Sequence, residues 1–462
     1  MIFLPDMLPQ NFQPATTQTD TNDEKPITRE NLMLRCVFSF VLIIFLAIVG
    51  AIVVLMSPLT PIEPFNTNLE WSALEVPNDL SSRVPFHIPR QLKIPKGFGI
   101  EVYAQVPSAR FLLTLPDNVI LVSQPKLGLV SLLRPSTSFH SPATHQTFIS
   151  NLNLPQDMVY HTEKNGTQYI YIAESTRVAR YLYRKGQKKL RFPEVIVDDL
   201  PYFDGYLHPY KGIAIGNGSL YVSIGSSSDT NAKDLLSEPK RGAIYAYRLS
   251  DGQRRLVSSG IRHAEGLAFQ PATGNLWAVS GQRTDIKYPF KDENYGEFVE
   301  DFALNNPVDE FMQIVEGENF GWPYCNPLHS FILPVQYAPD VENNPSEVIY
   351  NCSDFRKVDL DLPSHSVPLG LTFWSGQNVP NHYNGIAVVA LHDNRKDGHK
   401  VIHVPWNPLK RPQFFKELVV GWASESDEIR WGQPVDTAVM QDGSLLISED
   451  LHGVIYRLYK KT

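Results

Sequence analysis

From residue 97 onward the chain repeats one local pattern: a short apolar strand, a polar turn and a second strand, without long helical periodicity. Gly, Asn and Asp bound the strands and supply the turn conformations. One strand pair cannot bury both of its faces alone, so neighbouring pairs must pack against one another. The pattern occurs in segments that begin at Asp117, Gln168, Gly218, Gly274, Asn384 and Gly443.

These six units predict an all-β fold, a six-bladed β-propeller over residues 97–462. The opening strand, Gly97 to Val106, is expected to complete the blade that holds the last strands and so to close the ring. The spacing of the units is irregular, and a pair of β-sandwiches is the alternative fold.

Residues 260–285 (GIRHAEGLAFQPATGNLWAVSGQRTD) form a predicted hairpin with a polar loop at each end. Arg262, His263 and Glu265 directly precede its first strand, and residues 280–285 follow its second. A rigid hairpin that holds two polar loops is a common way for a β-scaffold to present a site. An ordinary solvated hairpin end is the alternative interpretation.

Charge, motifs and cysteine usage narrow the function. The net charge of −8 argues against a nucleic-acid or anionic-membrane binder. No HExxH, paired CxxC, GxSxG or phosphate-binding glycine loop occurs, which argues against zinc hydrolases, α/β-hydrolases and nucleotide binders.

Of three cysteines, Cys36 borders an apolar run, so Cys325 and Cys352 are expected to form a disulfide, with two buried free thiols as the alternative.

The run from Val37 to Met56 carries no charge and is long enough to cross a bilayer. Lys25, Arg29 and Arg35 precede the run, and no Lys or Arg follows it before Arg83. The positive-inside rule therefore places the N-terminus in the cytosol and the rest of the chain in the lumen or outside the cell. A cleavable signal peptide is the alternative, but the polar leader is long and a small-residue cleavage site is lacking.

The predicted organisation is thus that of a single-pass type II membrane protein. It has a disordered cytosolic tail (1–34), a transmembrane signal-anchor helix (35–56), a Pro-, Asn- and Ser-rich stalk (57–96) and the propeller (97–462). Potential glycosylation sites agree with this placement; they are Asn165, Asn217 and Asn351.

Several polar loops are expected at the top of the propeller channel. They include YLHPYK around His208, LPSHSVPLG around His365, the basic HDNRKDGHK at 392–400 and RWGQPVD at 430–436. A His in such a loop can act as general base, while Arg and Lys bind an anionic cofactor or substrate. For each His taken alone, a structural or solvated role is the alternative.

Six segments together resemble the soluble-quinoprotein glucose, sorbosone and aldose sugar dehydrogenases, over essentially residues 97–457 and in matching order. They are GFGIEVYAQVPSARFLLTLPDN, HPYKGIAIGNGSLYVSIGSSSD, GIRHAEGLAFQPATGNLW, VDEFMQIVEGENFGWPYC, LPSHSVPLGLTF and PVDTAVMQDGSLLISED. The resemblance implies a six-bladed propeller that binds pyrroloquinoline quinone and calcium. It also implies oxidation of sugar hydroxyl or hemiacetal groups, with electrons passing to an acceptor that the sequence does not identify.

The resemblance also implies residue roles. His208 matches the catalytic base and Arg262 the arginine near the quinone. Main-chain carbonyls of Gln282 and Arg283 match the calcium ligands. The cofactor contacts would be Gln156, Arg262, Glu265, His365, Arg395, Lys400 and Gln433.

The chain departs from the family pattern in ways that bear on cofactor binding. Glu265 stands where a Gln is familiar, and Gln433 stands where an Arg often grips the cofactor. Residues 280–284 read SGQRT where ENGRD is usual. A lost charge-assisted bond costs about 1.5–3 kcal/mol. Two alternatives therefore stay open: a catalytically silent binding propeller like the hedgehog-interacting proteins, and a calcium-dependent lactonase or esterase propeller.

Overall fold

The computed structural model describes residues 68–136, 141–203, 205–329, 335–393, 398–407, 411–424 and 429–461. The predicted cytosolic tail, the predicted membrane helix and the first part of the predicted stalk lie outside these residues. Among the residues that are described, no helix is both long and apolar enough to cross a membrane.

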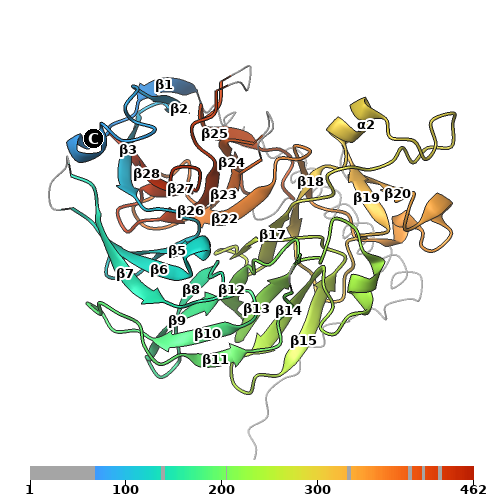
Figure 1. Cartoon of the computed structure of the whole chain (residues 1–462), viewed down its shortest axis with the longest axis horizontal. Helices are drawn as coiled ribbons and strands as arrows, with labels where there is room; N and C mark the ends of the chain where they lie inside the picture. The colour runs from blue at the N-terminus through green and yellow to red at the C-terminus, as the bar shows by residue number, and fades with distance from the viewer. Residues whose placement is uncertain are drawn as a thin grey trace, which may run out of the picture. The chain divides into compact units, whose positions relative to one another are not determined.

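Six antiparallel sheets form the blades of a β-propeller (Figure 1). In blades 1 to 3 the strands follow chain order from the channel outwards. Blade 1 consists of β4 (Leu112–Thr114), β5 (Ile120–Gln124), β6 (Leu129–Arg134) and β7 (Thr144–Ser150). Blade 2 consists of β8 (Met158–Thr162), β9 (Gln168–Ala173), β10 (Val178–Leu182) and β11 (Glu194–Val197). Blade 3 consists of β12 (Ile213–Gly216), β13 (Ser219–Ile224), β14 (Ala243–Arg248) and β15 (Arg254–Ser259).

Blades 4 to 6 depart from this simple chain order: a long segment interrupts blade 4, two earlier strands extend blade 5, and one earlier strand completes blade 6. Blade 4 consists of β16 (Gly266–Phe269), β17 (Leu276–Ser280), β18 (Asp309–Gln313) and β21 (Leu360–Leu362). Blade 5 begins with β22 (Pro368–Trp374), β23 (Ile386–Leu391), β24 (Lys400–Val404) and β25 (Lys416–Val420). Blade 6 takes β26 (Pro434–Val439), β27 (Leu445–Glu449), β28 (Val454–Lys460) and an earlier strand, β3 (Phe98–Gln105).

The ring closes where the sequence predicted. Strand β3 pairs with β28 in an antiparallel register that sets Gln105 opposite Val454 and Phe98 opposite Lys460. The innermost strands β4, β8, β12, β16, β22 and β26 contact one another in that order, and β26 contacts β4. The six-bladed propeller is therefore confirmed, and the β-sandwich alternative is wrong.

The predicted stalk is shortened by two strands. Strand β1 (Leu69–Ala73) pairs with β2 (Gln91–Pro95), and β2 pairs with β25, so blade 5 has six strands. Leu92 and Ile94 are fully buried against blades 5 and 6, which explains why this segment is a strand despite its Pro-rich surroundings. Within the described residues, strand structure therefore starts at Leu69, ahead of the boundary predicted at residue 97.

The core of the propeller is divided among the interfaces between blades. One apolar cluster joins blades 3 and 4, and separate clusters join each of the other neighbouring pairs around the ring. Because blades pack on both sides, an inner strand such as β17 is buried at every position. Its hairpin partner β16 pairs Gly266 with Val279 and Phe269 with Leu276, as the sequence predicted.

A long excursion separates β18 from β21 in blade 4. It contains the hairpin of β19 (Cys325–Leu328) and β20 (Gln336–Pro339). Cys325 and Cys352 form a disulfide across 27 positions of sequence, as expected, and both residues are buried.

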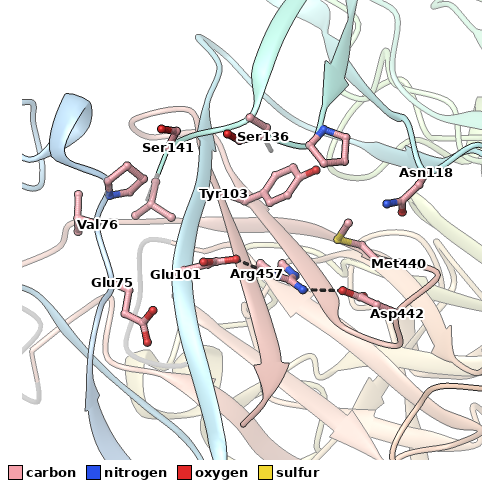
Figure 2. Close-up of a pocket in the computed structure, with 14 residues that line it drawn as sticks. Glu75, Val76, Glu101, Tyr103, Asn118, Ser136, Ser141, Met440, Asp442 and Arg457 are labelled. Carbon is pink, nitrogen blue, oxygen red and sulfur yellow. Dashed lines mark hydrogen bonds and ion pairs between the residues drawn. The ribbon is translucent and has the colours of Figure 1, made fainter. Parts of the chain in front are cut away.

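A pocket of about 250 Å³ lies between blades 6 and 1 (Figure 2). Tyr103 of β3 lines it, and Arg457 is held there by Glu101 (2.7 Å) and Asp442 (2.5 Å). Asp442 and Asn118 lie in the turns after innermost strands, at the opposite end of the blades from the predicted site loops. The pocket contains none of the predicted site residues, so the candidate site is sought elsewhere.

Removal of the disulfide should destabilise the domain. We expect the double substitution Cys325→Ala and Cys352→Ala to lower the free energy of unfolding by about 3 kcal/mol, because the bond restricts the unfolded chain. Urea unfolding followed by tryptophan fluorescence measures the change. Non-reducing peptide mapping is the control, and alkylation of both thiols in the native protein would contradict the bridge.

Candidate functional site

Two loops of each blade meet at one end of the channel, which we call the mouth. They are the loop before the innermost strand and the loop between the second and third strands, which an antiparallel blade brings to the same edge. Arg395 belongs to such a loop but lies outside the described residues. The predicted site residues found in these loops are Gln156, His208, Arg262, Glu265, Gln282, Arg283, His365 and Gln433.

Arg110, which the sequence analysis did not single out, makes contacts to four other blades. It precedes β4 in blade 1 and is 7% exposed. Its guanidinium donates hydrogen bonds to Asp450 of blade 6 (2.7 Å), Glu265 of blade 4 (3.2 Å) and Gln156 of blade 2 (3.3 Å). It also lies over the ring of Tyr210 in blade 3, 4.9 Å from the centroid. The positive charge of Arg110 is therefore compensated within the protein.

Glu265 is the buried counter-ion of this arginine. Besides Arg110, it accepts hydrogen bonds from Gln156 Nε2 (2.6 Å) and from His263 Nε2 (2.9 Å). Burial alone would raise the pKa of Glu265, but the hydrogen bond from His263 and the charge of Arg110 lower it below the ordinary value. The mouth therefore carries a negative charge at the position where the sequence resemblance expects a neutral Gln.

Blade 5 completes the network. His392 Nε2 lies 2.9 Å from Asp450 Oδ1, and Gln433 Nε2 donates a hydrogen bond to the carbonyl oxygen of His392 (3.2 Å). Burial opposes ionisation of Asp450, but His392 and Arg110 lower its pKa to about 2. Every blade of the propeller thus contributes a side chain to one connected set of contacts, which we call the Arg110 network.

His208 lies beside the Arg110 network and is held as a neutral base. Its ring stacks on His263, with centroids 4.3 Å apart. Nδ1 lies 3.0 Å from the carbonyl oxygen of Ser226, so Nδ1 carries the proton and Nε2 keeps its lone pair. Burial lowers the pKa of His208, and the neighbouring His263 and Arg262 lower it further. The ring can therefore accept a proton at Nε2 from a ligand.

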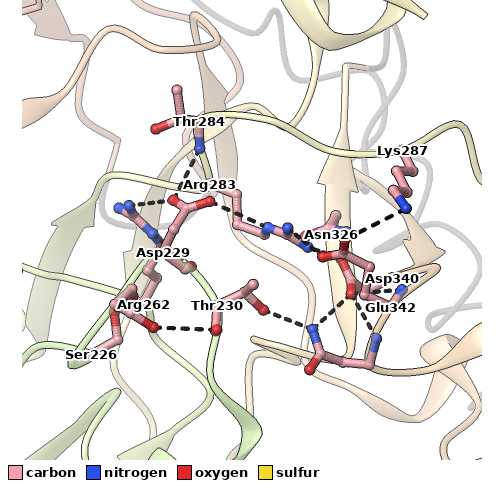
Figure 3. Close-up of polar contacts among 12 residues, drawn as sticks. Ser226, Asp229, Thr230, Arg262, Arg283, Thr284, Lys287, Asn326, Asp340 and Glu342 are labelled. Atoms are coloured by element: carbon pink, nitrogen blue, oxygen red, sulfur yellow. Dashed lines mark hydrogen bonds and ion pairs between the residues drawn. The ribbon is translucent and has the colours of Figure 1, made fainter. Parts of the chain in front are cut away.

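A second charged network contains Arg262, whose charge also acts on His208 (Figure 3). Arg262 donates to Asp229 Oδ1 (2.7 Å) and to the main-chain oxygen of Gly281 (3.2 Å). Arg283 forms ion pairs with Asp340 and, at 3.0 Å, with Glu342, and its Nε lies 3.6 Å from Asp229. Three carboxylates therefore surround two guanidinium groups, and neither arginine is without a protein counter-ion.

The predicted calcium ligands are compatible with a hard cation. Within the contacts of the described residues, the main-chain oxygens of Gln282 and Arg283 accept no hydrogen bond. The Oε1 atom of Gln282 is buried there without a partner. No group of three or more His, Cys, Asp or Glu side chains in the described part of the chain could hold a metal. A cation bound here would rest on main-chain and amide oxygens, which suit calcium.

Two buried carboxyl groups follow this loop on β18. Asp309 accepts hydrogen bonds from the main-chain N–H groups of Gln282 and Val367, both at 2.8 Å, and so ties two mouth loops together. Glu310 is fully buried, and the polar side chains of Gln282 and Ser280 only partly offset the effect of burial on its carboxyl group. Burial raises the pKa of Asp309 to about 6 and that of Glu310 to about 8, so Glu310 is protonated at neutral pH.

Two predicted cofactor contacts are directed away from the mouth. His365 Nε2 donates to the carbonyl oxygen of Ala303 (2.7 Å), which lies in helix α2 (Glu300–Asn305) between β17 and β18. Lys400 begins β24, and its Nζ lies 3.4 Å from Glu417 on the neighbouring strand β25. Neither contact joins the residue to the Arg110 network.

A family model described as TrAA12-like matches residues 92–461. The chain belongs to the TrAA12-like family. A search of curated proteins finds an uncharacterised protein of Borreliella burgdorferi, 23% identical over 385 residues, which cover 80% of this chain and 90% of that protein. The match to the TrAA12-like family begins inside β2, in agreement with the early start of the folded domain.

Solved structures agree on the fold of this TrAA12-like chain. The holo PQQ domain of Coprinopsis cinerea pyranose dehydrogenase has a TM-score of 0.67 at 16% identity, covering 80% of this chain and 97% of that one. The calcium structure of a Trichoderma reesei AA12 enzyme has a TM-score of 0.66 at 18% identity, with coverages of 79% and 96%. The PQQ-bound aldose sugar dehydrogenase of Streptomyces coelicolor has a TM-score of 0.52 at 16% identity, with coverages of 79% and 99%.

Sequence reasoning missed three members of the mouth of this TrAA12-like propeller: Arg110, Asp450 and Asp229. Arg110 had a usable signal, because it directly precedes an innermost strand, as His208 and Arg262 do. The two aspartates lie in loops after second strands, where a polar residue is ordinary, and only the fold shows which arginine each one meets.

Gly225 keeps the two imidazoles stacked. A Cβ atom at this position would lie 2.4 Å from His263 Nδ1 and 2.7 Å from His208 Cβ. We expect Gly225→Ala to displace the rings and to lower the free energy of unfolding by about 1–3 kcal/mol. Histidine ring NMR signals report the displacement. Gly281→Ala is the matched stability control, since its Cβ would meet no atom within 4 Å, and equal losses in the two variants would contradict the steric argument.

Glu310 should make stability depend on pH. Its pKa is about 8 when folded and close to 4.5 when unfolded, so the folded state binds an extra proton between these values. The wild type should therefore lose stability as pH rises from about 4.5 to 8. Urea midpoints of Glu310→Gln should exceed those of the wild type by a margin that grows over this range and then levels off. A margin that is constant with pH would contradict the raised pKa.

Proposed function

We propose that this chain is an oxidoreductase that oxidises a hydroxyl or hemiacetal group of a sugar, with pyrroloquinoline quinone as its cofactor. The observation that carries the proposal is the state of His208. Burial and neighbouring cations keep its imidazole neutral, its Nδ1 is fixed by Ser226, and Nε2 is the ring nitrogen that remains to accept a proton. The similar holo PQQ domain of a pyranose dehydrogenase and the similar PQQ-bound aldose sugar dehydrogenase support the choice of cofactor and substrate class.

His208 would remove the proton of the substrate hydroxyl. Because Nδ1 donates to a main-chain carbonyl, the ring keeps its orientation when Nε2 becomes protonated. The nearby charge of Arg262 disfavours a lasting imidazolium and so favours release of the proton after the step. When bound, pyrroloquinoline quinone would supply an electrophilic ortho-quinone as the hydride acceptor, and calcium would supply Lewis acidity.

The residues of the mouth fit this cofactor with one condition. Arg262 and Arg110 are the cations placed to meet its carboxylates, and Gln156 and Gln433 offer neutral amides. The calcium would lie on the main-chain oxygens of Gln282 and Arg283. Both arginines already pair with protein carboxylates. The cofactor can therefore bind them only if it shares the arginines with these carboxylates or displaces the carboxylates.

A silent propeller that binds a partner without chemistry is the second candidate. The observation that favours it is the same ion pairing: Arg110 and Arg262 have internal counter-ions, and Gln433 adds no charge. Such a mouth is stable without an anionic ligand. The lactonase or esterase alternative expected Asn, Asp and Glu side chains that converge on a calcium; among the described residues, no three or more His, Cys, Asp or Glu side chains form a group that could hold a metal.

We further propose a type II membrane topology with the propeller in the lumen or outside the cell. The uncharged run from residue 37 to 56 and its basic N-terminal flank motivate the proposal. The disulfide suits an oxidising compartment. The side chains of Asn165, Asn217 and Asn351 are exposed and so accessible to glycosylation.

His208→Ala separates the two candidate functions. After reconstitution with pyrroloquinoline quinone and calcium, we expect the variant to lower turnover of aldoses by about 10²–10⁴-fold. Cofactor affinity should change little, because the arginines remain. Dye-linked sugar oxidation and quinone titration measure the two quantities, and His145→Ala on the outer strand β7 is the matched control. A wild-type protein that binds the quinone yet oxidises no sugar would refute the proposed enzymatic activity.

The topology has its own test. In sealed vesicles from expressing cells, protease should spare an epitope placed after Thr462. Glycosidase treatment of the solubilised protein should increase its gel mobility. Permeabilised vesicles are the control, because there the protease must reach the epitope. Digestion of the epitope in sealed vesicles would reverse the proposed orientation.

A further inference from the structure

The Arg110 network has a consequence for the charge of the ligand. We propose that Glu265 limits how tightly the mouth binds an anionic ligand, because its carboxylate occupies the arginine that would otherwise receive a carboxylate of that ligand. The inference deepens the proposed function and rests on it for the location of the cofactor. It concerns binding, and so it can be tested apart from sugar oxidation.

The contacts of Arg110 leave no guanidinium nitrogen without a protein acceptor. Nη1 donates to Asp450, Nη2 to Glu265 and Nε to Gln156. The face of the guanidinium lies over Tyr210. Three of the five N–H donors of this guanidinium are therefore engaged, and a ligand carboxylate that binds the arginine must approach it beside two protein carboxylates.

Electrostatic repulsion from the protein's carboxylates opposes the binding of a ligand carboxylate at Arg110. Arg110 faces two carboxylates, those of Glu265 and Asp450, and the network of Arg262 and Arg283 faces three more. The stacked histidines add no positive charge while they are neutral. Pyrroloquinoline quinone would bring three further carboxylates, which repel the protein's own at short range.

Glu265 is a better candidate than Asp450 for setting this limit. Glu265 is 4% exposed, and it bonds His263, which stacks on His208. Its charge is therefore poorly screened and adjacent to the proposed reaction site. A glutamine in its place has the same size, and its carbonyl oxygen can still accept the hydrogen bond from His263. The Glu265→Gln substitution thus removes the negative charge of this side chain without changing its size.

The test compares ligand binding by the folded wild type and Glu265→Gln. Pyrroloquinoline quinone with calcium is titrated by tryptophan quenching, and benzene-1,3,5-tricarboxylate, which undergoes no redox reaction here, by calorimetry. We expect both to bind about 10- to 100-fold more tightly to the variant, the gain that one freed charge-assisted contact gives. Asp450→Asn should act in the same direction, and the gain should vanish when Arg110→Ala is added to Glu265→Gln.

Glu163→Gln is the matched control, because Glu163 pairs with Arg180 in blade 2 (2.6 Å), outside the mouth loops, and should leave both affinities unchanged. Equal or weaker binding by Glu265→Gln and Asp450→Asn would overturn the inference. If the wild type oxidises sugar while these variants show no gain in affinity, the proposed function stands and the inference fails. If the variants gain affinity for both probes and neither they nor the wild type oxidise sugar, the inference stands and the proposed enzymatic activity is refuted.

Discussion

The ion pairs of Arg110 are the interaction on which the arrangement of the mouth depends. A guanidinium that is 7% exposed would be costly to bury alone, and it is tolerated because Glu265 and Asp450 lie within hydrogen-bond distance. The three residues come from blades 1, 4 and 6. Their pairing fixes the position of loops that share no strand, and Gln156 adds blade 2. The charge of one side chain thereby sets the spacing of loops around the whole ring.

The neutral part of the site lies between two charged parts. His208 and His263 are stacked and buried; Glu265 of the Arg110 network bonds His263, and Arg262, which pairs with Asp229, lowers the pKa of His208. The cationic neighbours disfavour an imidazolium, while Glu265 holds His263 in one orientation. The same contacts that stabilise the mouth therefore also prepare a base and restrict the anions that can approach it. Stability and ligand choice are set by the same few residues.

Much of the fold was predictable because it follows local pattern. The strand pairs, the hairpin at residues 266–280, the ring closure by β3 and the disulfide all followed from alternation, turn residues and cysteine count. Strands β1 and β2 did not, because Pro-rich flanks obscured two short strands that tertiary burial stabilises. The charge balance of the mouth was not predictable either. Arg110 and Asp450 are 340 positions apart, and no local pattern reports such a pair.

The position of strands β1 and β2 has a mechanical meaning. They form the outer edge of blade 5, whereas β3, which follows directly, lies in blade 6. A pulling force applied at the N-terminal side would first meet β1 and β2, whose hydrogen bonds can break one after another without opening the ring. Only after they detach would the load reach β3, whose eight-residue strand pairs along β28 and closes the propeller. Strands β1 and β2 would therefore detach before a pulling force acts on the β3–β28 pairing that closes the propeller.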